Sequence, residues 1–507
     1  MIMQPTSTPT LLHDILDQRA AAAPTAQALR RGNRTWSYRE LAGRSDAAAR
    51  WLSGLGVGRG DRIVLLGHNQ IELVPLLFAA SRLGAIFVLL SDRTTAYHLR
   101  HILADCTPTV VIGGPVAVDL VRASTDVDMP VHTLADAPAA TTQPATDVSR
   151  PCLSVDPVCL IYTSGSTALP KAVVCTHRQV LFAALAIHSR LSYRSDDTVF
   201  CCLPLSFDYG LYQVFLCCVA GARLVLGDDG DAGPTLLRRL DAENVSVLPL
   251  VPSLAATLCR LVRRVGIAPT RLRMVTNTGA DLSPARCATL RTAMPGLAVV
   301  AMFGLTECKR VSIAEPNLDL IRPGSVGRPL PDTEVSIVDE KGQPLPPGVP
   351  GELVVRGPNV MAGYWNAPEL TAARYRTGKH GQPVLHTGDR CLIDDDGYLY
   401  FVGRADDIFK QHGFRVSTTE IEAAALDIPG VEAAAALPPD GEHGSRLAVC
   451  GDLTDRQVAD GLVARLEEPK LPGECRVVPG LPLTVNGKVD KRTLAEQWAG
   501  VPEEAVA

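Results

Sequence analysis

The chain has 507 residues, of which 46% are hydrophobic and 20% are charged, a composition typical of a folded protein with roughly two to four domains. Its formal net charge of −5 argues against a nucleic-acid-binding surface. The most apolar stretch, residues 76–90, contains Arg82 and Gly84 and is shorter than the about 20 residues of a membrane span, so we expect no membrane association.

The fourteen cysteines are scattered along the chain, without a CxxC pair or a Cys/His cluster. This spacing argues against a zinc site and against thioredoxin-like chemistry, and it predicts buried, reduced thiols. The N-terminus lacks the pattern of a secretion signal. Both observations lead us to expect a cytoplasmic protein.

The first three hundred residues alternate between expected helices and strands. This alternation favours parallel sheets with helices on both faces. Glycines at 54, 56, 58 and 60 precede a strand instead of following one, so they do not form a dinucleotide-binding fingerprint. Residues 134–151, rich in Ala, Thr and Pro, predict an exposed connection. The expected helices are 36–52, 71–83, 95–105, 177–190 and 209–219, and the expected strands are 63–66, 85–90, 109–112, 199–203, 222–226, 245–248, 274–278 and 298–302.

The character of the sequence changes near residue 324, where short alternating strands and Gly/Pro turns begin. It changes again after Gly403, and the last hundred residues predict a small α+β unit. We therefore expect an α/β protein with a large N-terminal region of doubly wound sheets (1–405), which ends in a β-rich subdomain (about 324–405). A small, mobile α+β C-terminal domain (406–507) is expected to follow.

Residues 162–171 read Tyr-Thr-Ser-Gly-Ser-Thr-Ala-Leu-Pro-Lys and lie between two apolar runs that predict buried strands. Hydroxyls and backbone N–H groups in a turn can donate to a polyphosphate, and a lysine adds a point charge. The segment is not a Walker A loop, because Pro170 precedes Lys171 and no Ser or Thr follows it. Taken alone, it is equally compatible with a polar hairpin turn.

The segment resembles the phosphate-binding loop of the acyl-adenylate-forming superfamily, which comprises acyl-CoA synthetases, luciferases and the adenylation domains of nonribosomal peptide synthesis. Five further segments resemble elements of that family in the expected order: 303–307 (Phe-Gly-Leu-Thr-Glu), 387–389 (Thr-Gly-Asp), 403–406 (Gly-Arg-Ala-Asp), 410–416 and 486–490 (Asn-Gly-Lys-Val-Asp). Ala168 and Ala172 replace glycines of the family pattern. If either position required positive φ, alanine would cost about 1–2 kcal/mol.

The resemblance implies ATP and Mg²⁺ as cofactors and assigns roles to individual residues. Phe303 would stack on adenine, Asp389 would accept hydrogen bonds from both ribose hydroxyls, and Arg404 would contact ribose or phosphate. The nucleotide-binding residues implied in this way are Thr163, Ser164, Gly165, Ser166, Thr167, Lys171, Gly279, Ala280, Phe303, Gly304, Asp389 and Arg404.

The same resemblance implies four catalytic residues: Thr306 on the α-phosphate, Glu307 as a metal ligand, Lys488 between the substrate carboxylate and the α-phosphate, and Asp406 as a pivot. A cation that contacts both anions lowers the barrier most where charge develops. Rotation of the small domain about the pivot would exchange the constellation for adenylation with the one for thioester formation.

Asp208 suggests what kind of acid is bound. Amino-acid-activating members of the family have Phe-Asp at this position, and a buried carboxylate needs a cationic partner such as a substrate ammonium. The alternative is that Asp208 caps the following helix. Arg310 could pair with a second acidic group or lie beneath the pocket. The expected substrate-binding residues are Phe207, Asp208, Tyr209, Tyr212, Thr276, Met302, Arg310 and Val311.

The sequence therefore predicts an AMP-forming ligase. It would activate a small carboxylic acid, expected to be an amino acid, and transfer the acyl group to the phosphopantetheine thiol of a separate carrier protein. The first alternative is an acyl-CoA ligase for a short or aromatic acid. The second, motivated by Ala168 and Ala172, is a nucleotide-binding paralogue without catalysis.

Overall fold

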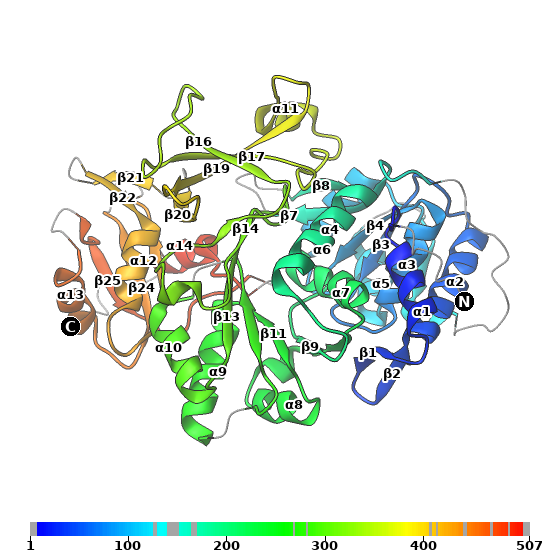
Figure 1. Ribbon diagram of the computed structural model, residues 1–507, viewed down its shortest axis with the longest axis horizontal. Helices are drawn as coiled ribbons and strands as arrows, with labels where there is room; N and C mark the ends of the chain where they lie inside the picture. Colours follow the sequence, from blue (N-terminus) through cyan, green and yellow to red (C-terminus); the bar gives the residue numbers. More distant parts are fainter. Residues whose placement is uncertain are drawn as a thin grey trace.

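The computed structural model describes residues 8–124, 129–138, 152–163, 170–266, 269–279, 282–404, 408–411, 414–439, 444–466, 470–484 and 487–499. Figure 1 shows the N-terminal sheet and its helices on the right, a second sheet in the centre, a β-rich part at the top and the C-terminal part on the left. The expected α/β class, with a β-rich part, is confirmed.

The first sheet has six strands among the described residues. In spatial order they are β6 (Val131–Thr133), β5 (Val110–Gly113), β3 (Arg62–Leu66), β4 (Ile86–Leu90), β7 (Pro157–Thr163) and β8 (Lys171–Thr176). All neighbours are parallel except β7 and β8, which are antiparallel and flank the segment expected to bind phosphate.

Helices cover both faces of this sheet. They are α2 (Tyr38–Gly54), α3 (Leu73–Leu83), α4 (Ala96–Cys106), α5 (Pro115–Ser124) and α6 (His177–Leu191). Alternate residues of β3 point to opposite faces: Ile63 and Leu65 join the core that contains α3 and α6, whereas Val64 and Leu66 join the core that contains α4 and α5. Burial on both faces explains why β3 and β4 read as continuous apolar runs.

The start of α2 differs from the expectation. Trp36 belongs to a strand, and the helix begins at Tyr38, because the Ser37 side chain accepts from the backbone N–H of Glu40 while the Glu40 side chain accepts from that of Ser37. This capping box fixes the helix N-terminus.

The second sheet has nine strands among the described residues. In order they are β15 (Arg328–Pro329), β14 (Ser312–Ile313), β13 (Ala298–Phe303), β12 (Met274–Asn277), β11 (Val247–Leu250), β9 (Thr198–Cys201), β10 (Arg223–Leu226), β1 (Gln27–Arg31) and β2 (Arg34–Ser37). The run from β13 to β1 is parallel. The associated helices are α1 (Asp14–Ala22), α7 (Asp208–Ala220), α8 (Leu236–Ala242), α9 (Pro252–Val265) and α10 (Pro284–Ala293).

The β-rich part is a sheet of five antiparallel-paired strands with one short helix. Its elements are β16 (Glu334–Val338), β17 (Gly351–Arg356), α11 (Pro368–Arg374), β18 (Tyr375–Thr377), β19 (Pro383–Ile393) and β20 (Leu399–Arg404). Three 3-10 turns complete the chain before this point: Leu134–Asp136, Asp229–Ala232 and Leu318–Leu320. The first lies in the expected connection 134–151, of which residues 139–151 fall outside the described part.

The C-terminal part has its own small cores of apolar side chains. Its elements are β21 (Ile408–Gln411), β22 (Phe414–Ser417), α12 (Thr418–Leu426), β23 (Val431–Leu437), β24 (Arg446–Gly451), α13 (Asp455–Val463), β25 (Glu474–Val477) and α14 (Lys491–Ala499). It touches α9 through Arg260, which pairs with Glu432, and through Ser253, which donates to the carbonyl of Gly487. The domain boundary near residue 405 stays a prediction.

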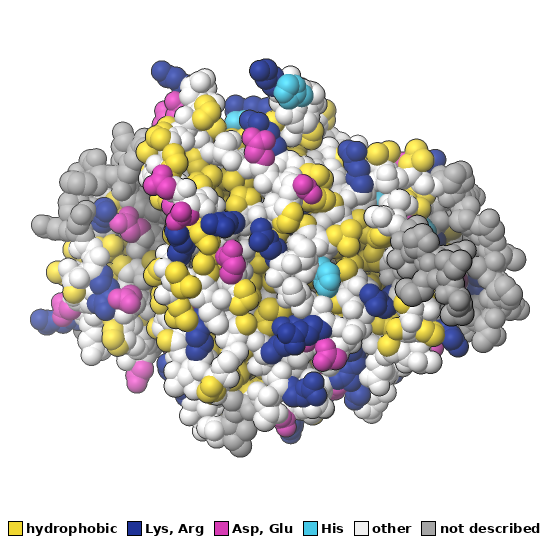
Figure 2. All heavy atoms as spheres, viewed as in Figure 1, with side chains coloured by type: hydrophobic (Ala, Val, Ile, Leu, Met, Phe, Trp, Pro, Cys, Tyr) yellow, Lys and Arg dark blue, Asp and Glu magenta, His cyan; other side chains and the backbone are white. Residues whose placement is uncertain are grey.

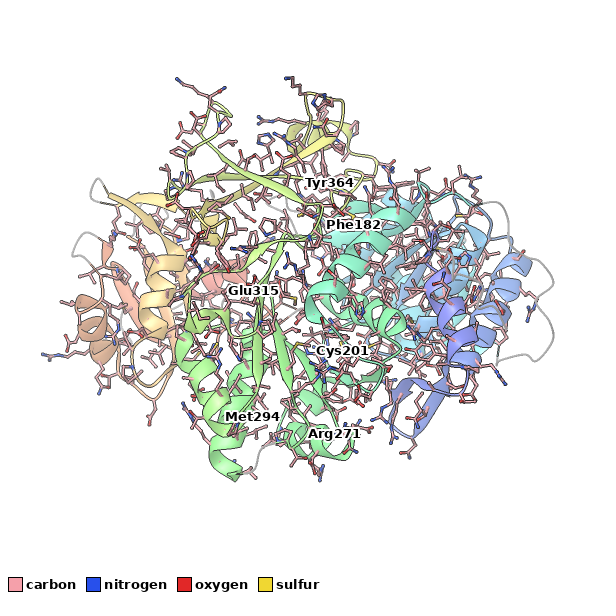
Figure 3. The ribbon with its side chains drawn as sticks, in the orientation of Figure 1. Phe182, Cys201, Arg271, Met294, Glu315 and Tyr364 are labelled. Atoms are coloured by element: carbon pink, nitrogen blue, oxygen red, sulfur yellow. The ribbon has the colours of Figure 1, made fainter. Side chains whose placement is uncertain are left out.

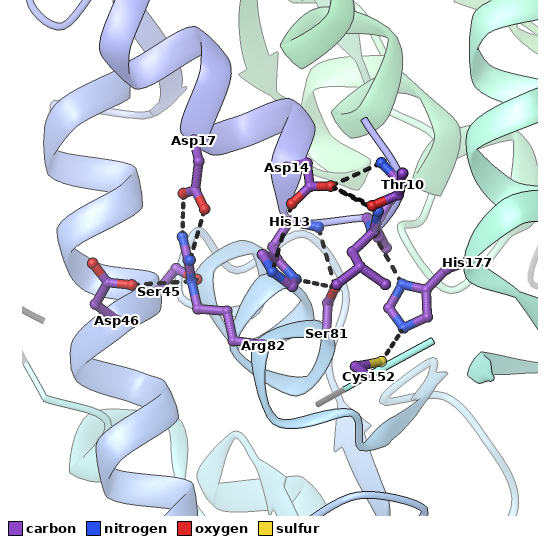
Figure 4. Close-up of polar contacts among 12 residues, drawn as sticks. Thr10, His13, Asp14, Asp17, Ser45, Asp46, Ser81, Arg82, Cys152 and His177 are labelled. Carbon is purple, nitrogen blue, oxygen red and sulfur yellow. Dashed lines mark hydrogen bonds and ion pairs between the residues drawn. The ribbon is translucent and has the colours of Figure 1, made fainter. Parts of the chain in front are cut away.

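A polar cluster joins the N-terminal segment to α2, α3 and α6 (Figure 4). His13 Nδ1 lies 2.9 Å from Ser81 Oγ, and Arg82 pairs with Asp17. His177 Nδ1 accepts from the backbone N–H of Leu12 at 3.1 Å, so the neutral ring carries its proton on Nε2. We call this group, with Asp14, Ser45, Asp46 and Cys152, the N-terminal cluster.

Eleven of the fourteen cysteines are buried and the other three are half-buried, and none of them forms a disulfide. Cys201, labelled in Figure 3, and Cys202 close β9, and both are in the core. Burial raises the pKa of Cys201 to about 12. Acidic and basic side chains are interspersed over the face shown in Figure 2. Across the described residues, no helix is both long enough and apolar enough to cross a membrane.

Candidate active site

Lys171 and Glu307 meet through the hydroxyl of Tyr364. Lys171 begins β8, opposite Thr163 on β7. Its Nζ donates to Tyr364 Oη at 2.9 Å, and that hydroxyl donates to Glu307 Oε1 at 2.6 Å. Lys171 Nζ and Glu307 Oε1 are 3.7 Å apart. Two residues that the sequence assigned to phosphate and metal binding are therefore neighbours, although 136 positions separate them in the chain.

Ala172 lies inside β8, opposite Tyr162, and is not among the residues with positive φ. Alanine in place of glycine therefore causes no left-handed strain at this position. The concern about strain does not apply to Ala172, and Ala168 falls outside the described residues.

The turn after β13 brings a lysine into the protein interior. The backbone returns so closely that a Cβ on Gly304 would lie 2.5 Å from the carbonyl oxygen of Lys309 and 2.7 Å from the Cα of Arg310. Val311 N–H donates to the Phe303 carbonyl at 2.9 Å and closes the turn. Lys309 adopts φ +61° and its side chain is fully buried. Only glycine at position 304 permits this close approach.

Asp208, the first residue of α7, receives the Lys309 ammonium. The distance from Lys309 Nζ to Asp208 Oδ2 is 2.9 Å, and Thr306 Oγ1 donates to the same oxygen at 3.1 Å. Phe207, not Asp208, occupies the helix N-cap and makes no side-chain cap bond, so the capping alternative is wrong. The cationic partner that burial of Asp208 demands is supplied within the chain, by a residue that the sequence reading missed.

Charges around Asp208 keep it ionised. Burial raises the pKa of this carboxyl, but Lys309 and Arg310 outweigh burial and hold the pKa at about 2. Lys309 Nζ also lies 4.1 Å from the centre of the Tyr212 ring, and the Arg310 guanidinium lies 5.2 Å from that of Tyr209. Aromatic faces stabilise such desolvated cations.

The remaining residues of the expected substrate pocket border this charged group. Tyr209 Oη donates to the Thr276 carbonyl at 2.8 Å, and Arg310 Nη1 donates to the Lys309 carbonyl at 2.8 Å. Within the described part of the chain, Arg310 Nε and Tyr212 Oη have no hydrogen-bond partner, although both are buried. We call Asp208, Tyr209, Tyr212, Lys309 and Arg310 the Asp208 cluster. Met302 and Val311, also buried, lie on the strand and turn that carry it.

Phe303 and Asp389 lie on the side toward the β-rich part. The Phe303 ring packs on Phe401 of β20, with centroids 5.4 Å apart. Asp389 is buried on β19 opposite the backbone of Arg404, and its N–H donates to Thr387 Oγ1. Burial, with the charges of Glu307 and Asp389, raises the pKa of Cys308.

Lys488 reaches the same place from the C-terminal part. Thr484 N–H donates to the Lys488 carbonyl at 2.7 Å, and Gly487, the residue before the lysine, adopts φ +74°. Its Nζ lies 5.6 Å from the centre of the Phe207 ring, and a Cβ on Gly279 would lie 3.0 Å from its Cε. The lysine also contributes to the low pKa of Asp208. Lys488 therefore lies beside the Asp208 cluster, although 178 positions separate it from Arg310, the cluster member nearest to it in the sequence.

Several predicted site residues lie outside the described residues, namely Ser164, Gly165, Ser166, Thr167, Ala280 and Asp406, and the Arg404 side chain is likewise not described. The sequence analysis did not identify two candidate functional residues, Lys309 and Tyr364. Lys309 follows the Thr-Glu motif by two residues, but neither its burial nor its positive φ leaves a sequence signal. Tyr364 lies in the Gly-Tyr-Trp-Asn segment 363–366, which could have been recognised as a turn beside an aromatic pair.

The side chains present suit a magnesium ion that arrives with a nucleotide. Magnesium bound with phosphates needs only one or two protein carboxylates and keeps several waters. Glu307 is one accessible carboxylate beside Lys171. Across the described residues, no group of three His, Cys, Asp or Glu side chains could hold a metal by itself. The donor set therefore fits Mg²⁺ shared with ATP.

Comparison with known proteins identifies relatives along nearly the whole chain. Residues 16–365 match the AMP-binding enzyme family. The chain is 34% identical over 493 residues to a feruloyl-CoA synthase from Amycolatopsis sp., covering 94% of this chain and 96% of that one. It is 30% identical over 518 residues to an isonitrile lipopeptide synthase from Mycobacterium tuberculosis, covering 97% of this chain and 20% of that longer protein.

A solved structure of VinN in complex with L-aspartate is 42% identical to the chain, with a TM-score of 0.70. The match covers 78% of this chain and 98% of that one. VinN has also been solved in complex with 3-methylaspartate, with 40% identity, a TM-score of 0.64 and coverage of 77% of this chain and 98% of that one.

Proposed function

The chain belongs to the AMP-binding enzyme family and is an AMP-forming ligase, and we propose that its acid substrate is a small amino acid with a second carboxylate, of the aspartate type. The observation that carries this proposal is the Asp208 cluster: one carboxylate and two cations, all buried.

The charges of the cluster favour a substrate with one extra negative charge. Asp208 pairs with Lys309, and among the described residues Arg310 Nε has no hydrogen-bond partner. An unpaired buried charge is costly, so a ligand carboxylate that meets Arg310 and Lys309 would be bound strongly. The same ligand's ammonium would share Asp208. The VinN complexes with L-aspartate and 3-methylaspartate support this class of acid, because that relative is 40–42% identical over more than three quarters of this chain.

In the proposed reaction, the other carboxylate of the acid attacks the α-phosphate of ATP and pyrophosphate leaves. Lys488 would hold the attacking carboxylate beside the phosphate, and Thr306 and Lys171 would hold phosphate oxygens. Phe303 would carry adenine and Asp389 the ribose hydroxyls. Mg²⁺, when bound at Glu307 with the phosphates, would neutralise their charge.

For the second half-reaction we propose transfer to the phosphopantetheine thiol of a separate carrier protein. The match to part of a lipopeptide synthase supports this acceptor, and the match to a feruloyl-CoA synthase supports the alternative, free CoA. Swinging of the C-terminal part about Asp406 would bring the second constellation into place.

Ferulate-type acids are the second candidate substrate class, because the feruloyl-CoA synthase aligns over nearly the whole chain. An aromatic acid without a second carboxylate would bring no additional negative charge to Arg310 and Lys309, which share Asp208, and this charge balance disfavours the alternative. The alternative of a nucleotide-binding paralogue without catalysis is weakened, because Ala172 is unstrained in β8.

ATP–pyrophosphate exchange with a panel of acids tests the proposal. We expect exchange with L-aspartate or 3-methylaspartate and little with ferulate or indoleacetate. Arg310→Gln should raise the KM for the dicarboxylic acid by at least tenfold and leave the KM for ATP unchanged. Exchange with ferulate alone would overturn the proposed substrate, and exchange with no acid would support the catalysis-free alternative. Acyl transfer to free CoA, compared with a phosphopantetheinylated carrier, then decides the acceptor.

A further inference from the structure

Tyr364 is fixed at both ends and along its ring. The segment 361–365 pairs with β8 through an isolated antiparallel bridge: Val174 N–H donates to the Gly363 carbonyl and Trp365 N–H to the Ala172 carbonyl, both at 2.9 Å. The Tyr364 N–H donates to Thr371 Oγ1 at 2.9 Å. Figure 3 shows Tyr364 where the β-rich sheet meets the region of β8 and α6.

The same segment also holds the backbone of Glu307. Met361 N–H donates to the Glu307 carbonyl at 2.9 Å. The Tyr364 ring meets Tyr375 edge to face, with centroids 5.6 Å apart and planes at 80°. The segment 361–365 therefore fixes the backbone of Glu307 relative to β8. The Tyr364 ring places its hydroxyl between the Lys171 and Glu307 side chains.

The Tyr364 hydroxyl keeps Lys171 and Glu307 from closing onto each other. It accepts from Lys171 and donates to Glu307, and the two charged atoms stay 3.7 Å apart. A contact ion pair between ammonium and carboxylate would be shorter, at about 2.7–2.9 Å. Both side chains are only about 15% exposed, so a closed pair would be strong and slow to give way to a ligand.

We propose that Tyr364 is a positioning residue for the nucleotide half of the reaction, because its hydroxyl holds Lys171 and Glu307 open for phosphate oxygens and Mg²⁺. When Mg·ATP binds, Lys171 donates to phosphate oxygens and Glu307 presents its carboxylate to the metal. No contact ion pair between Lys171 and Glu307 has to be broken first. This inference concerns ATP, not the acid, and rests on the proposed roles of Lys171 and Glu307.

The test is Tyr364→Phe in the full-length protein, titrated calorimetrically with Mg²⁺ and the α,β-methylene analogue of ATP in the absence of any acid. We expect the dissociation constant to rise about tenfold, as for loss of one hydrogen bond to charged groups. AMP binding without Mg²⁺ should change by less than twofold. In kinetics, KM for ATP should rise more than kcat falls, and transfer from a preformed acyl-adenylate should be unchanged.

Tyr375→Phe is the matched control. It removes one hydroxyl from the partner ring, and that hydroxyl has no hydrogen-bond partner within the described residues. Its affinity for the Mg²⁺–analogue complex should equal that of the unchanged protein. An equal loss of affinity in both variants, or a lower melting temperature of Tyr364→Phe with unchanged affinity, would reduce Tyr364 to a packing role and overturn the proposal.

Lys171→Met and Glu307→Gln separate the positioning role of Tyr364 from the proposed nucleotide-binding roles of Lys171 and Glu307. If both weaken binding and Tyr364→Phe does not, the positioning role is overturned while the proposed nucleotide site stands. If neither weakens binding, the nucleotide roles of Lys171 and Glu307 fail, and the inference about Tyr364 fails with them.

Discussion

The N-terminal cluster and the Asp208 cluster both combine Asp and Arg with other polar side chains, but the buried titratable groups of the two clusters are stabilised differently. In the N-terminal cluster, His13 and His177 are paired with Ser81 and the Leu12 backbone, and burial lowers the pKa of both rings, to about 4 for His177. In the Asp208 cluster a carboxylate stays ionised against two buried cations. Buried histidines relieve the cost of burial by staying neutral, whereas an excess cation can be relieved only by a ligand. The residue types alone do not separate a structural cluster from a binding one.

The largest contrast should appear on removing one cation from each cluster. Lys309→Met leaves Asp208 buried without its lysine and should cost about 3–5 kcal/mol of unfolding free energy. Arg82→Met in the N-terminal cluster should cost about 1 kcal/mol, because its Asp17 and Asp46 partners are partly exposed to water. Denaturant unfolding measures both. Adding Asp208→Asn to Lys309→Met should recover most of the loss, and equal losses in the two clusters would remove the distinction.

Lys488→Ala tests whether the lysine beside the Asp208 cluster acts in adenylate formation. The lysine is positioned to stabilise the negative charge that develops in the transition state. Its loss should lower the rate of pyrophosphate exchange by about 10²–10³-fold. Thioester formation from a preformed adenylate should persist. Lys491→Ala is the control, since that lysine pairs with Glu422 away from Phe207. Equal loss of both half-reactions in Lys488→Ala would contradict a change of constellation between them.

The N-terminal cluster should respond to pH where the Asp208 cluster does not. The pKa of His177 is 6.5 when unfolded and about 4 when folded, so the unfolded chain binds more protons between these values. Stability is then fully present above pH 6.5 and falls as the pH drops toward 4, by at most about 3 kcal/mol. Melting temperatures across this range should fall less steeply in His177→Gln than in the exposed control His380→Gln. The Asp208 carboxyl, whose pKa is held at about 2 in the folded protein, adds a slope only below about pH 5, where the unfolded chain begins to protonate it.

The smallest effect is expected from Gly279→Ala. The new Cβ would lie 3.0 Å from Lys488 Cε at a residue with φ +90°, so exchange should fall about tenfold while transfer from a preformed adenylate is spared. Gly296→Ala is the matched control, because it has φ +87° and no atom within 4 Å of the new Cβ. If both variants lose the same exchange activity, strain alone explains the effect and the approach of Lys488 does not.

Most of the fold and about half of the site geometry could be predicted from the sequence. Strands such as β3 and β4 were visible because burial on both faces leaves a continuous apolar run. The motifs containing Glu307, Asp389 and Lys488 were visible because each has a fixed local pattern. The helix start at Tyr38 was misplaced by two residues, since an apolar Trp36 fits a strand end and a helix start equally well.

The missed residues share a physical cause. Lys309 looks like any surface lysine until the return of the chain over Gly304 carries it inside, and this return depends on contacts between distant strands. Tyr364 acquires its role only because a segment near residue 363 pairs with β8, which lies almost 190 residues earlier. The local sequence around Tyr364 can indicate a turn with aromatic residues, but it does not indicate which distant residues the tyrosine contacts.

Burial of the cysteine thiols has a chemical consequence for an enzyme that forms activated acyl groups. An acyl-adenylate is an electrophile, and a thiolate is the form of cysteine that attacks. Cys308 directly follows Glu307, yet it is fully buried, and burial raises its pKa. A cysteine adjacent to the proposed reaction centre is thereby kept protonated and inaccessible, which would protect the enzyme against acylating itself before the acceptor thiol arrives.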